Sequence, residues 1–198
     1  GDGGEDVNLP IENNVAVIKN EFRADSEKVG PLATKKYTDY TGSKPLQSGM
    51  FEFKMKALNG GPLPADMKPD SNGYVYVTNS ADTIALGQIE FTAKQANQTF
   101  EYEVSEVTPE NPINGMTYDD TVYIVKMNVG VKEINEVPTV VVETIYCDAN
   151  GNPLSSDQLD NGRLVFKNSY KANSVILSGE TAIKGSKTLV GRDMKDNE

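Results

Sequence analysis

Residues 100–107 read FEYEVSEV, a stretch in which apolar side chains alternate with carboxylates. Successive side chains of a β-strand point to opposite faces of the sheet, so this period of two predicts a strand with one apolar and one polar face. Similar alternation marks six further segments, which are residues 50–55, 74–77, 89–91, 121–131, 138–147 and 164–170. Clusters of glycine, proline, asparagine and aspartate separate these segments. The pattern predicts an all-β fold, a sandwich of two antiparallel sheets.

Two short segments have a weaker, helical pattern, residues 81–86 and 92–98. Neither is long enough to bury a face alone. The all-β expectation therefore stands.

The composition excludes several classes of function. The 198 residues contain no histidine, no tryptophan and a single cysteine, Cys147, which we expect to fill space at a strand end. Histidine-based catalytic triads, histidine-containing zinc and haem sites, internal disulfides and thiolate metal clusters are excluded, and we expect neither a metal nor a cofactor. The net charge of −10 disfavours nucleic acid and anionic lipid as partners. No apolar run is long enough for a membrane-spanning helix, so we expect no membrane insertion.

A long-period repeat indicates how the chain is divided. Residues 15–25 read VAVIKNEFRAD and residues 163–173 read RLVFKNSYKAN. A weaker match aligns the region of Lys35 with that of Lys187. The spacing is that of a whole domain and is far longer than a solenoid repeat. Residues 15–22 either end a preceding module or form an N-terminal strand of the same domain. We interpret the chain as three parts, a module-end-like strand segment (1–29), one complete module (30–171), and a linker with the first strand of a following module (172–198).

Three polar residues lie in phase with apolar ones and are expected to point into the core. Glu106 continues the apolar row of the FEYEVSEV strand. Asn168 and Lys35 occupy the inward rows of the last and first strand segments of the module. The same alternation turns Lys36 outward. Lys36 remains the alternative to Lys35 as the lysine that points into the core. Because a lone charge or amide is costly to bury, we expect the three groups to pair.

Lysine, glutamate and asparagine held together in an apolar interior can form a covalent bond. Burial lowers the pKa of a lysine amine and raises the pKa of a glutamate carboxyl, which favours the neutral forms of both. A neutral amine can attack the carboxamide, while a protonated carboxyl polarises the carbonyl and moves protons as ammonia leaves. The product is an amide between the two side chains, and its formation requires no external enzyme or cofactor.

The order of motifs along the chain resembles that of a known family. The chain carries ATK at residues 33–35, MFEFKM at 50–55, a glycine, an isoleucine and a phenylalanine at 87, 89 and 91, Y-x-V-x-E at 102–106, TYDDTVYIVKMNV at 117–129 and VFKNSY at 165–170. In this order the motifs resemble the isopeptide-linked pilin domain of Gram-positive surface proteins, over roughly residues 30–171.

The resemblance implies both a fold and a site. The fold would be an immunoglobulin-like sandwich similar to collagen-adhesin B domains. The site would be a bond between Lys35 and Asn168 that Glu106 assists. The resemblance further implies that Asn20 is a module-end asparagine and that Lys187 is the lysine of the next module, each without its own partner in this sequence.

These observations lead to one principal hypothesis. We expect a structural module of a cell-surface pilus or adhesin stalk, outside the cell and attached to the cell wall. Its partners would be neighbouring modules or subunits of the same fibre. Bond formation is a single maturation step, so we do not expect an enzyme that turns over a substrate.

Two alternatives use other residues. An adhesin domain would recognise host glycan or matrix protein through its long loops, residues 59–72 and 147–161. In the second loop, the sequence DANGN is expected to form a turn. A glycosidase would need a carboxylate pair such as Glu101 and Glu103, but these residues lie on the polar face of their predicted strand and not in a predicted cleft.

Overall fold

The computed structural model describes residues 11–12, 15–16 and 24–172. Its strands are β1 (Ile11–Glu12), β2 (Val15–Ala16), β3 (Glu27–Val29), β4 (Leu32–Asp39), β5 (Glu52–Ala57), β6 (Val75–Thr78), β7 (Thr83–Ala85), β8 (Ile89–Phe91), β9 (Gln98–Glu106), β10 (Met116–Thr117), β11 (Val122–Ile134), β12 (Val137–Cys147) and β13 (Leu164–Tyr170). Two short 3₁₀ turns, η1 (Ala93–Gln95) and η2 (Ser156–Gln158), are the helical segments of this described part. Neither turn has the length or apolar character to cross a membrane.

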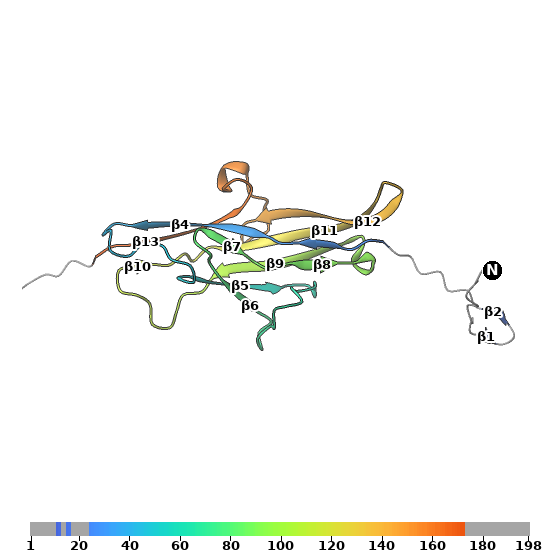
Figure 1. Cartoon of the computed structure of the whole chain (residues 1–198), viewed down its shortest axis with the longest axis horizontal. Coiled ribbons are helices and arrows are strands. Elements are labelled where there is room, and N and C mark those ends of the chain that lie inside the picture. Colours follow the sequence, from blue (N-terminus) through green and yellow to red (C-terminus); the bar gives the residue numbers. More distant parts are fainter. Residues whose placement is uncertain (1–10, 13–14, 17–23, 173–198) are drawn as a thin grey trace, which may run out of the picture.

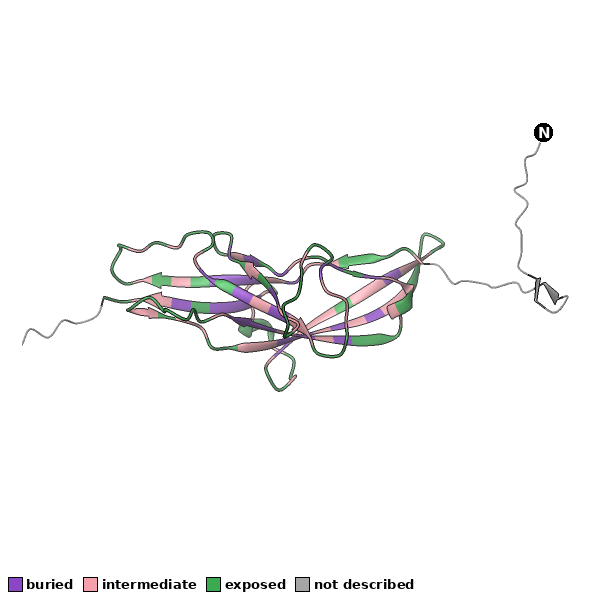
Figure 2. Cartoon of the chain, turned by 90° about the horizontal axis from the view of Figure 1, so that it is seen from below, coloured by how far each residue is buried: buried purple, intermediate pink, exposed green. Residues whose placement is uncertain are grey.

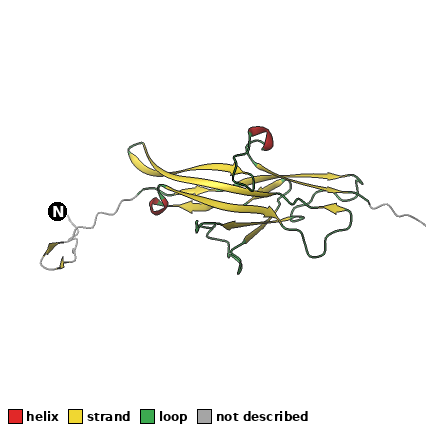
Figure 3. Ribbon diagram, turned by 180° about the vertical axis from the view of Figure 1, so that it is seen from behind, coloured by secondary structure: helices red, strands yellow, loops and turns green. Residues whose placement is uncertain are grey.

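Most of the strands form two facing sheets (Figure 1). One sheet has five strands in the order β12-β11-β9-β5-β6, and the other has four in the order β10-β13-β4-β7. β3 pairs with β8, and β1 pairs with β2. Figure 3 shows the long strands following the long axis of the molecule. The predicted all-β sandwich is confirmed.

One strand pair departs from the antiparallel pattern. β4 and β13 run parallel, with Ala33 opposite Leu164 and Asp39 opposite Tyr170. Parallel neighbours cannot be joined by a hairpin, and here most of the sandwich lies between them in the sequence. The four-stranded sheet therefore places its first and last strands along the chain side by side.

The core lies between the two sheets. The rings of Phe53 on β5 and Phe166 on β13 meet across it with centroids 5.0 Å apart, and Tyr123 on β11 packs edge-on against Phe166. Figure 2 shows the buried positions along the strands and the exposed positions concentrated in the loops. Burial of this apolar surface is the main stabilising contribution. The other large apolar side chains that are fully buried are Met55, Val75, Ile84, Leu86, Ile89, Phe91, Tyr102, Met127 and Leu164.

The residues just before Gly30 are also part of the sandwich. The backbone N–H of Asp25 donates to the carbonyl of Pro138 at 3.0 Å, and its carbonyl accepts from the N–H of Val140 at 2.9 Å. β3 then pairs with β8. The chain thus joins the sheets ahead of Gly30, the residue at which the sequence interpretation begins the module.

One of the two segments with a helical pattern is a strand. β7 lies within residues 81–86 and pairs antiparallel with β4. Its threonine and isoleucine are β-branched, and pairing with the edge of β4 overrides a weak local preference for helix. The second segment contains the single turn η1, whose first backbone N–H groups are capped by Thr92. The weak helical pattern of residues 81–86 therefore does not form a helix, in agreement with the all-β prediction.

Two expectations for the end of β12 are confirmed. Cys147 is fully buried at the end of the strand. The carboxylate of Asp148 accepts hydrogen bonds from the backbone N–H groups of Asn150 and Asn152, each at 2.9 Å. An aspartate that binds the backbone two residues onward is typical of a tight turn, so the DANGN sequence forms the turn that it predicts.

Candidate functional site

Three buried polar side chains meet between the two sheets. Lys35 lies on β4, Asn168 lies on β13, and Glu106 is the last residue of β9 in the facing sheet. In the parallel pairing Lys35 is opposite Phe166, so Asn168, two residues further along, lies on the same face and diagonal to Lys35. Glu106 is opposite Phe53 in the β5–β9 pairing and reaches the other two side chains from across the core.

The three side chains form a closed set of hydrogen bonds. Nζ of Lys35 donates to Oε2 of Glu106 at 2.7 Å and also to Oδ1 of Asn168. Nδ2 of Asn168 donates to Oε1 of Glu106 at 2.5 Å. Each group therefore contacts both of the others. Within the described part of the chain, every buried side-chain nitrogen and oxygen has a partner.

The surroundings of this cluster are apolar. Lys35, Glu106 and Asn168 are exposed by only 2%, 6% and 5%. Nζ of Lys35 lies 4.2 Å from the ring centroid of Phe51 and 5.3 Å from that of Phe53. Aromatic rings attract an ammonium group but replace only part of its hydration. The apolar surroundings therefore raise the free energy of the charged forms of both the amine and the carboxyl.

Burial sets the protonation of the lysine and the glutamate. Removal from water lowers the pKa of Lys35, against the opposing hydrogen bond and charge of Glu106. The same loss of hydration raises the pKa of Glu106, against the hydrogen bonds from Lys35 and Asn168. These two shifts favour a neutral amine beside a protonated carboxyl. The negative charge of Asp119 makes a smaller contribution, which opposes the lowering of the Lys35 pKa and adds to the raising of the Glu106 pKa.

This arrangement contains the parts needed for amide formation. The amine of Lys35 contacts the carboxamide of Asn168, which carries the carbon it would attack. The carboxyl of Glu106 contacts both the amine and the amide nitrogen that would leave. A neutral amine is nucleophilic, and a carboxyl in contact with two nitrogen atoms can pass a proton between them. Holding the groups together lowers the entropic part of the barrier.

The neighbouring lysine points away from the core. Nζ of Lys36 forms an ion pair with Oδ1 of Asp160 at 2.7 Å, and the Lys36 side chain is 51% exposed. The strand phase that turns Lys35 inward and Lys36 outward is therefore confirmed. Asn20 and Lys187, the other two candidates, lie outside the described residues.

Two residues near the cluster were not among the sequence candidates. Phe51 covers the amine of Lys35, and its place in the apolar row of MFEFKM was a signal that could have identified it. Asp119 accepts a hydrogen bond from the backbone N–H of Lys167, at a sequence separation of 48. No local pattern in the sequence indicates this contact.

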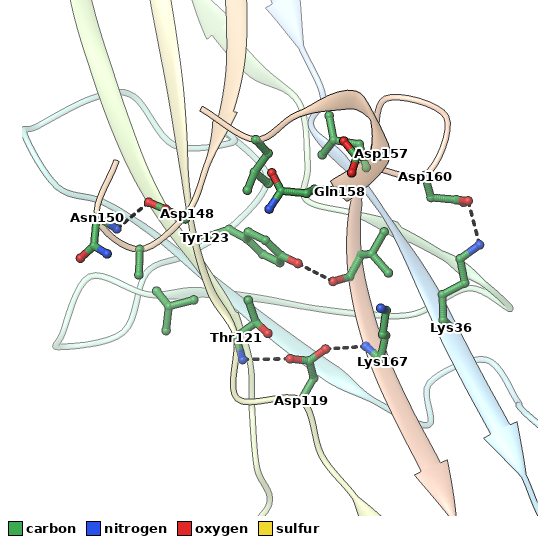
Figure 4. Close-up of a pocket in the computed structure, with 15 residues that line it drawn as sticks. Lys36, Asp119, Thr121, Tyr123, Asp148, Asn150, Asp157, Gln158, Asp160 and Lys167 are labelled. Atoms are coloured by element: carbon green, nitrogen blue, oxygen red, sulfur yellow. Dashed lines mark hydrogen bonds and ion pairs between the residues drawn. The ribbon is translucent and has the colours of Figure 1, made fainter. Parts of the chain in front are cut away.

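A separate pocket of about 800 Å³ lies on the surface between β11, β13 and the loop that follows β12 (Figure 4). Much of its wall comes from the loop that the adhesin alternative assigns to recognition, residues 147–161. Figure 4 shows the hydroxyl of Tyr123 donating a hydrogen bond to a backbone carbonyl of β13, and Lys36 forming an ion pair with Asp160. The pocket is lined by both polar and apolar side chains, and it lies outside the core cluster.

The carboxylate pair of the glycosidase alternative has other partners. Oε1 of Glu101 forms an ion pair with Lys126 at 3.3 Å, and Oε1 of Glu103 accepts a hydrogen bond from the hydroxyl of Tyr74 at 2.7 Å. Neither glutamate lines the pocket described above. Their positions on the polar face of β9 give no support to a catalytic cleft.

Comparison with known proteins gives one matching family and several matching solved structures. The model of the family FctA, the Spy0128-like isopeptide containing domain, matches residues 31–171. The major pilin from Streptococcus pyogenes is 18% identical, with a TM-score of 0.42 over 71% of this chain and 50% of that chain. The major pilin protein T-13 from Streptococcus pyogenes is 16% identical, with a TM-score of 0.41 over 75% of this chain and 54% of that chain. The chain thus spans about half the length of these pilins. No curated protein matches it in sequence.

Proposed function

The chain belongs to the family of the Spy0128-like isopeptide containing domain, and from this premise we propose that it forms an internal amide bond between Lys35 and Asn168 with the help of Glu106. The bonded domain would serve as a structural module of a cell-surface pilus or adhesin stalk. The observation that carries the proposal is the closed set of contacts among the three buried side chains.

The proposed reaction exchanges one amide for another. The lone pair of Nζ of Lys35 attacks Cγ of Asn168, and protonated Glu106 donates a hydrogen bond and then a proton to the carbonyl oxygen. Glu106 takes a proton from the attacking amine, delivers one to Nδ2 of Asn168, and takes back the proton of the oxygen as the carbonyl re-forms. The Cγ–Nδ2 bond breaks, ammonia leaves, and the carboxyl of Glu106 ends in its starting protonation state. One C–N bond forms and one breaks, so the reaction needs no oxidant, cofactor or energy source.

The reaction occurs once in the life of each chain. Its nucleophile and its electrophile are both consumed in the bond, so the site cannot turn over a substrate. Its rate depends on proximity and on a dry environment, and both arise only when the sandwich folds. The proposed role is therefore structural.

The position of the bond suits a module that carries load. The described chain enters the sandwich and leaves it at opposite ends of the long axis (Figure 1). β4 and β13 are parallel neighbours, so a pull on the two ends loads the ladder between them. A bond from Lys35 to Asn168 would join these strands covalently and close a loop over a sequence separation of 133. Force would then pass through the bond while the rest of the sandwich stays folded.

The proposed partners are neighbouring modules or subunits of the same fibre, on the outside of the cell and attached to its wall. The division of the chain belongs to the same proposal, with residues 1–29 as a module end whose last residues, from Asp25 on, join this sandwich, 30–171 as one module and 172–198 as the start of the next. Asn20 and Lys187 would be the counterparts of Asn168 and Lys35 in those neighbours. The family model, which matches residues 31–171, supports the bounds of the central module.

Intact mass spectrometry of the folded protein tests the bond directly. The expected mass is lower than the sequence mass by one ammonia. The variants Lys35→Ala and Asn168→Ala are expected to have their full calculated masses. Fragmentation of a digest should also yield one branched peptide that joins the two strands. A wild-type mass equal to the sequence mass would overturn the proposal.

Ligand recognition is a second candidate function, and the surface pocket is the observation that favours it. The loop after β12 contributes much of that pocket, and loops on a rigid sandwich commonly carry recognition. Binding to arrayed host glycans and matrix proteins would test this function. A variant in which residues 149–159 are replaced by a glycine–serine loop of equal length should lose any such binding.

A further inference from the structure

The carboxylate of Asp119 holds the strand that carries Asn168. β10 pairs with β13 through Met116 opposite Tyr170 and Thr117 opposite Ser169, and the ladder then ends. Where a further backbone pair would lie, Oδ2 of Asp119 accepts a hydrogen bond from the backbone N–H of Lys167 at 2.5 Å. The side chain of Asp119 thus takes the place of the missing strand beside β13.

The same carboxylate is fixed from the other side. Oδ1 of Asp119 accepts a hydrogen bond from the backbone N–H of Thr121 at 2.9 Å, just before β11 begins. Figure 4 shows Asp119 between Thr121 and Lys167, with one oxygen directed to each. Lys167 immediately precedes Asn168, so this bridge holds the backbone from which the carboxamide projects into the core. A displacement of about 1 Å at a reacting group can slow a reaction about 100-fold.

The residue before Asp119 contacts the amine side of the cluster. The ring of Tyr118 packs edge-on against Phe51, with centroids 6.2 Å apart. Phe51 in turn lies over Nζ of Lys35, at 4.2 Å from the ring centroid. The short segment of Tyr118 and Asp119 therefore supports both reactants, the amine through an aromatic contact and the carboxamide through the backbone of β13.

Asp119 also adds charge near the reacting groups. Burial is the main cause of the lowered pKa of Lys35 and of the raised pKa of Glu106, and the negative charge of Asp119 makes a smaller contribution that opposes the first shift and adds to the second. The other charged groups around the pocket that Asp119 lines are Lys36 on β4, Lys167 on β13, and Asp148, Asp157 and Asp160 in the loop after β12, and Tyr123 faces it from β11. None of these groups contributes to the shifts of Lys35 and Glu106.

We propose that Asp119 is a positioning residue for the amide-forming reaction: it anchors β13 next to Asn168 and so holds the carboxamide against the amine of Lys35. This inference rests on the proposed function. In the reactive state the amine of Lys35 is neutral and the carboxyl of Glu106 is protonated, so the pair carries one exchangeable acidic proton, and that proton is on the carboxyl. A nearby negative charge favours the protonated form of both groups. Its removal therefore moves the pH range in which this reactive state is populated to lower pH.

The test measures bond formation from the unfolded chain. The whole chain is made by chemical synthesis and ligation in denaturant, so that it has never folded and has the full sequence mass, and it is then refolded by dilution at a series of pH values. Samples are quenched with acid and denaturant at set times, and intact mass gives the fraction that has lost ammonia. The variants are Asp119→Ala, which loses both hydrogen bonds and the charge, Asp119→Asn, which loses the charge and one of the two acceptor oxygens, and Asp119→Glu, which keeps the charge and both acceptor oxygens. Asp120→Asn is the matched control, because Asp120 is an exposed neighbour.

The expected results separate the two roles of Asp119. Asp119→Ala should slow ammonia loss by up to about 100-fold. Asp119→Asn should move the pH profile to lower values, and a purely structural contact would not cause that shift. Asp119→Glu should keep the wild-type pH range, as should Asp120→Asn. Wild-type rates and an unchanged profile in both Asp119→Ala and Asp119→Asn would overturn the inference. A wild-type chain that folds without losing ammonia would overturn the proposed function, and this inference with it.

Discussion

Lys35 and Asn168 are separated by 133 positions in the sequence, and their side chains are in contact in the core, on neighbouring parallel strands. Glu106 approaches both from the facing sheet. The two reactants thus come from one sheet and the proton carrier comes from the other. The reactive cluster is complete only when the first and last strands of the four-stranded sheet have paired and the two sheets have closed, so bond formation should follow folding.

Replacement of Glu106 by glutamine should prevent the bond while preserving the shape of the site. A carboxamide can still donate and accept hydrogen bonds, but it cannot pass a proton from the amine to the leaving nitrogen. We expect intact mass spectrometry of Glu106→Gln to give the full calculated mass. The matched control is Glu103→Gln on the outer face of the same strand, which should lose one ammonia as the wild type does. An equal loss from both variants would contradict the role of Glu106.

The two adjacent lysines should respond differently to the same substitution. Lys35→Arg places a permanently charged, non-nucleophilic group in the core, so the bond should not form and the protein should also be destabilised. Lys36→Arg keeps the exposed ion pair with Asp160, and its effect on the free energy of unfolding should remain below about 1 kcal/mol. Intact mass and thermal unfolding measured on both variants would show this contrast. A full-mass Lys36→Arg protein would instead assign the reaction to Lys36.

Much of the candidate site could be predicted from the alternation of apolar and polar residues. The phase of FEYEVSEV turns Glu106 inward, and the phases of the strands around Lys35 and Asn168 do the same, because alternate residues of a strand share one face. Phase does not say which strands become neighbours or in which direction they run. The parallel pairing of β4 with β13 depends on packing of the whole sandwich, and no short window of sequence contains it.

The features that sequence analysis missed also depend on distant contacts. Residues 83–85 form a strand because the edge of β4 offers them hydrogen-bond partners, and that edge is about fifty positions away in the sequence. Asp119 became a candidate only when its carboxylate was found beside the backbone of Lys167. In both cases the local sequence has only a weak preference, and tertiary packing decides the outcome.

The proposed bond should raise stability substantially. A cross-link that closes a loop of this length reduces the entropy of the unfolded chain, and the loop-closure model gives about 5 kcal/mol. We therefore expect the wild type to unfold at a markedly higher guanidinium concentration than Glu106→Gln. The denaturant dependence should also be shallower for the wild type, because a cross-linked unfolded chain exposes less surface. Equal midpoints for a bonded and an unbonded protein would contradict the stabilising role.

One buried and two partly buried tyrosines should make the fold sensitive to alkali. Loss of hydration raises the pKa of Tyr102, Tyr123 and Tyr146 above the usual value. A group whose pKa is higher in the folded state stabilises the fold fully below its unfolded pKa, about 10 for tyrosine, and that contribution is lost as the pH rises further. Chemical denaturation at increasing pH should show stability falling above pH ~10. Tyr102→Phe should reduce the slope, with the exposed Tyr40→Phe as control, and an unchanged slope would argue against this origin.

Mechanical extension should distinguish the bonded from the unbonded chain by length. When handles pull the two ends of the chain, the unbonded Glu106→Gln protein should release the segment between positions 35 and 168. That segment extends to about 450 Å, since a separation of 133 residues contributes about 3.4 Å each. The bonded wild type should lengthen only by the chain outside the bond, because the force passes from Lys35 to Asn168 through a covalent link. Single-molecule force spectroscopy measures this difference directly, and Lys36→Arg should behave as the wild type does. A wild-type protein that releases the full segment under force, while its mass shows the loss of ammonia, would place the cross-link between residues other than Lys35 and Asn168.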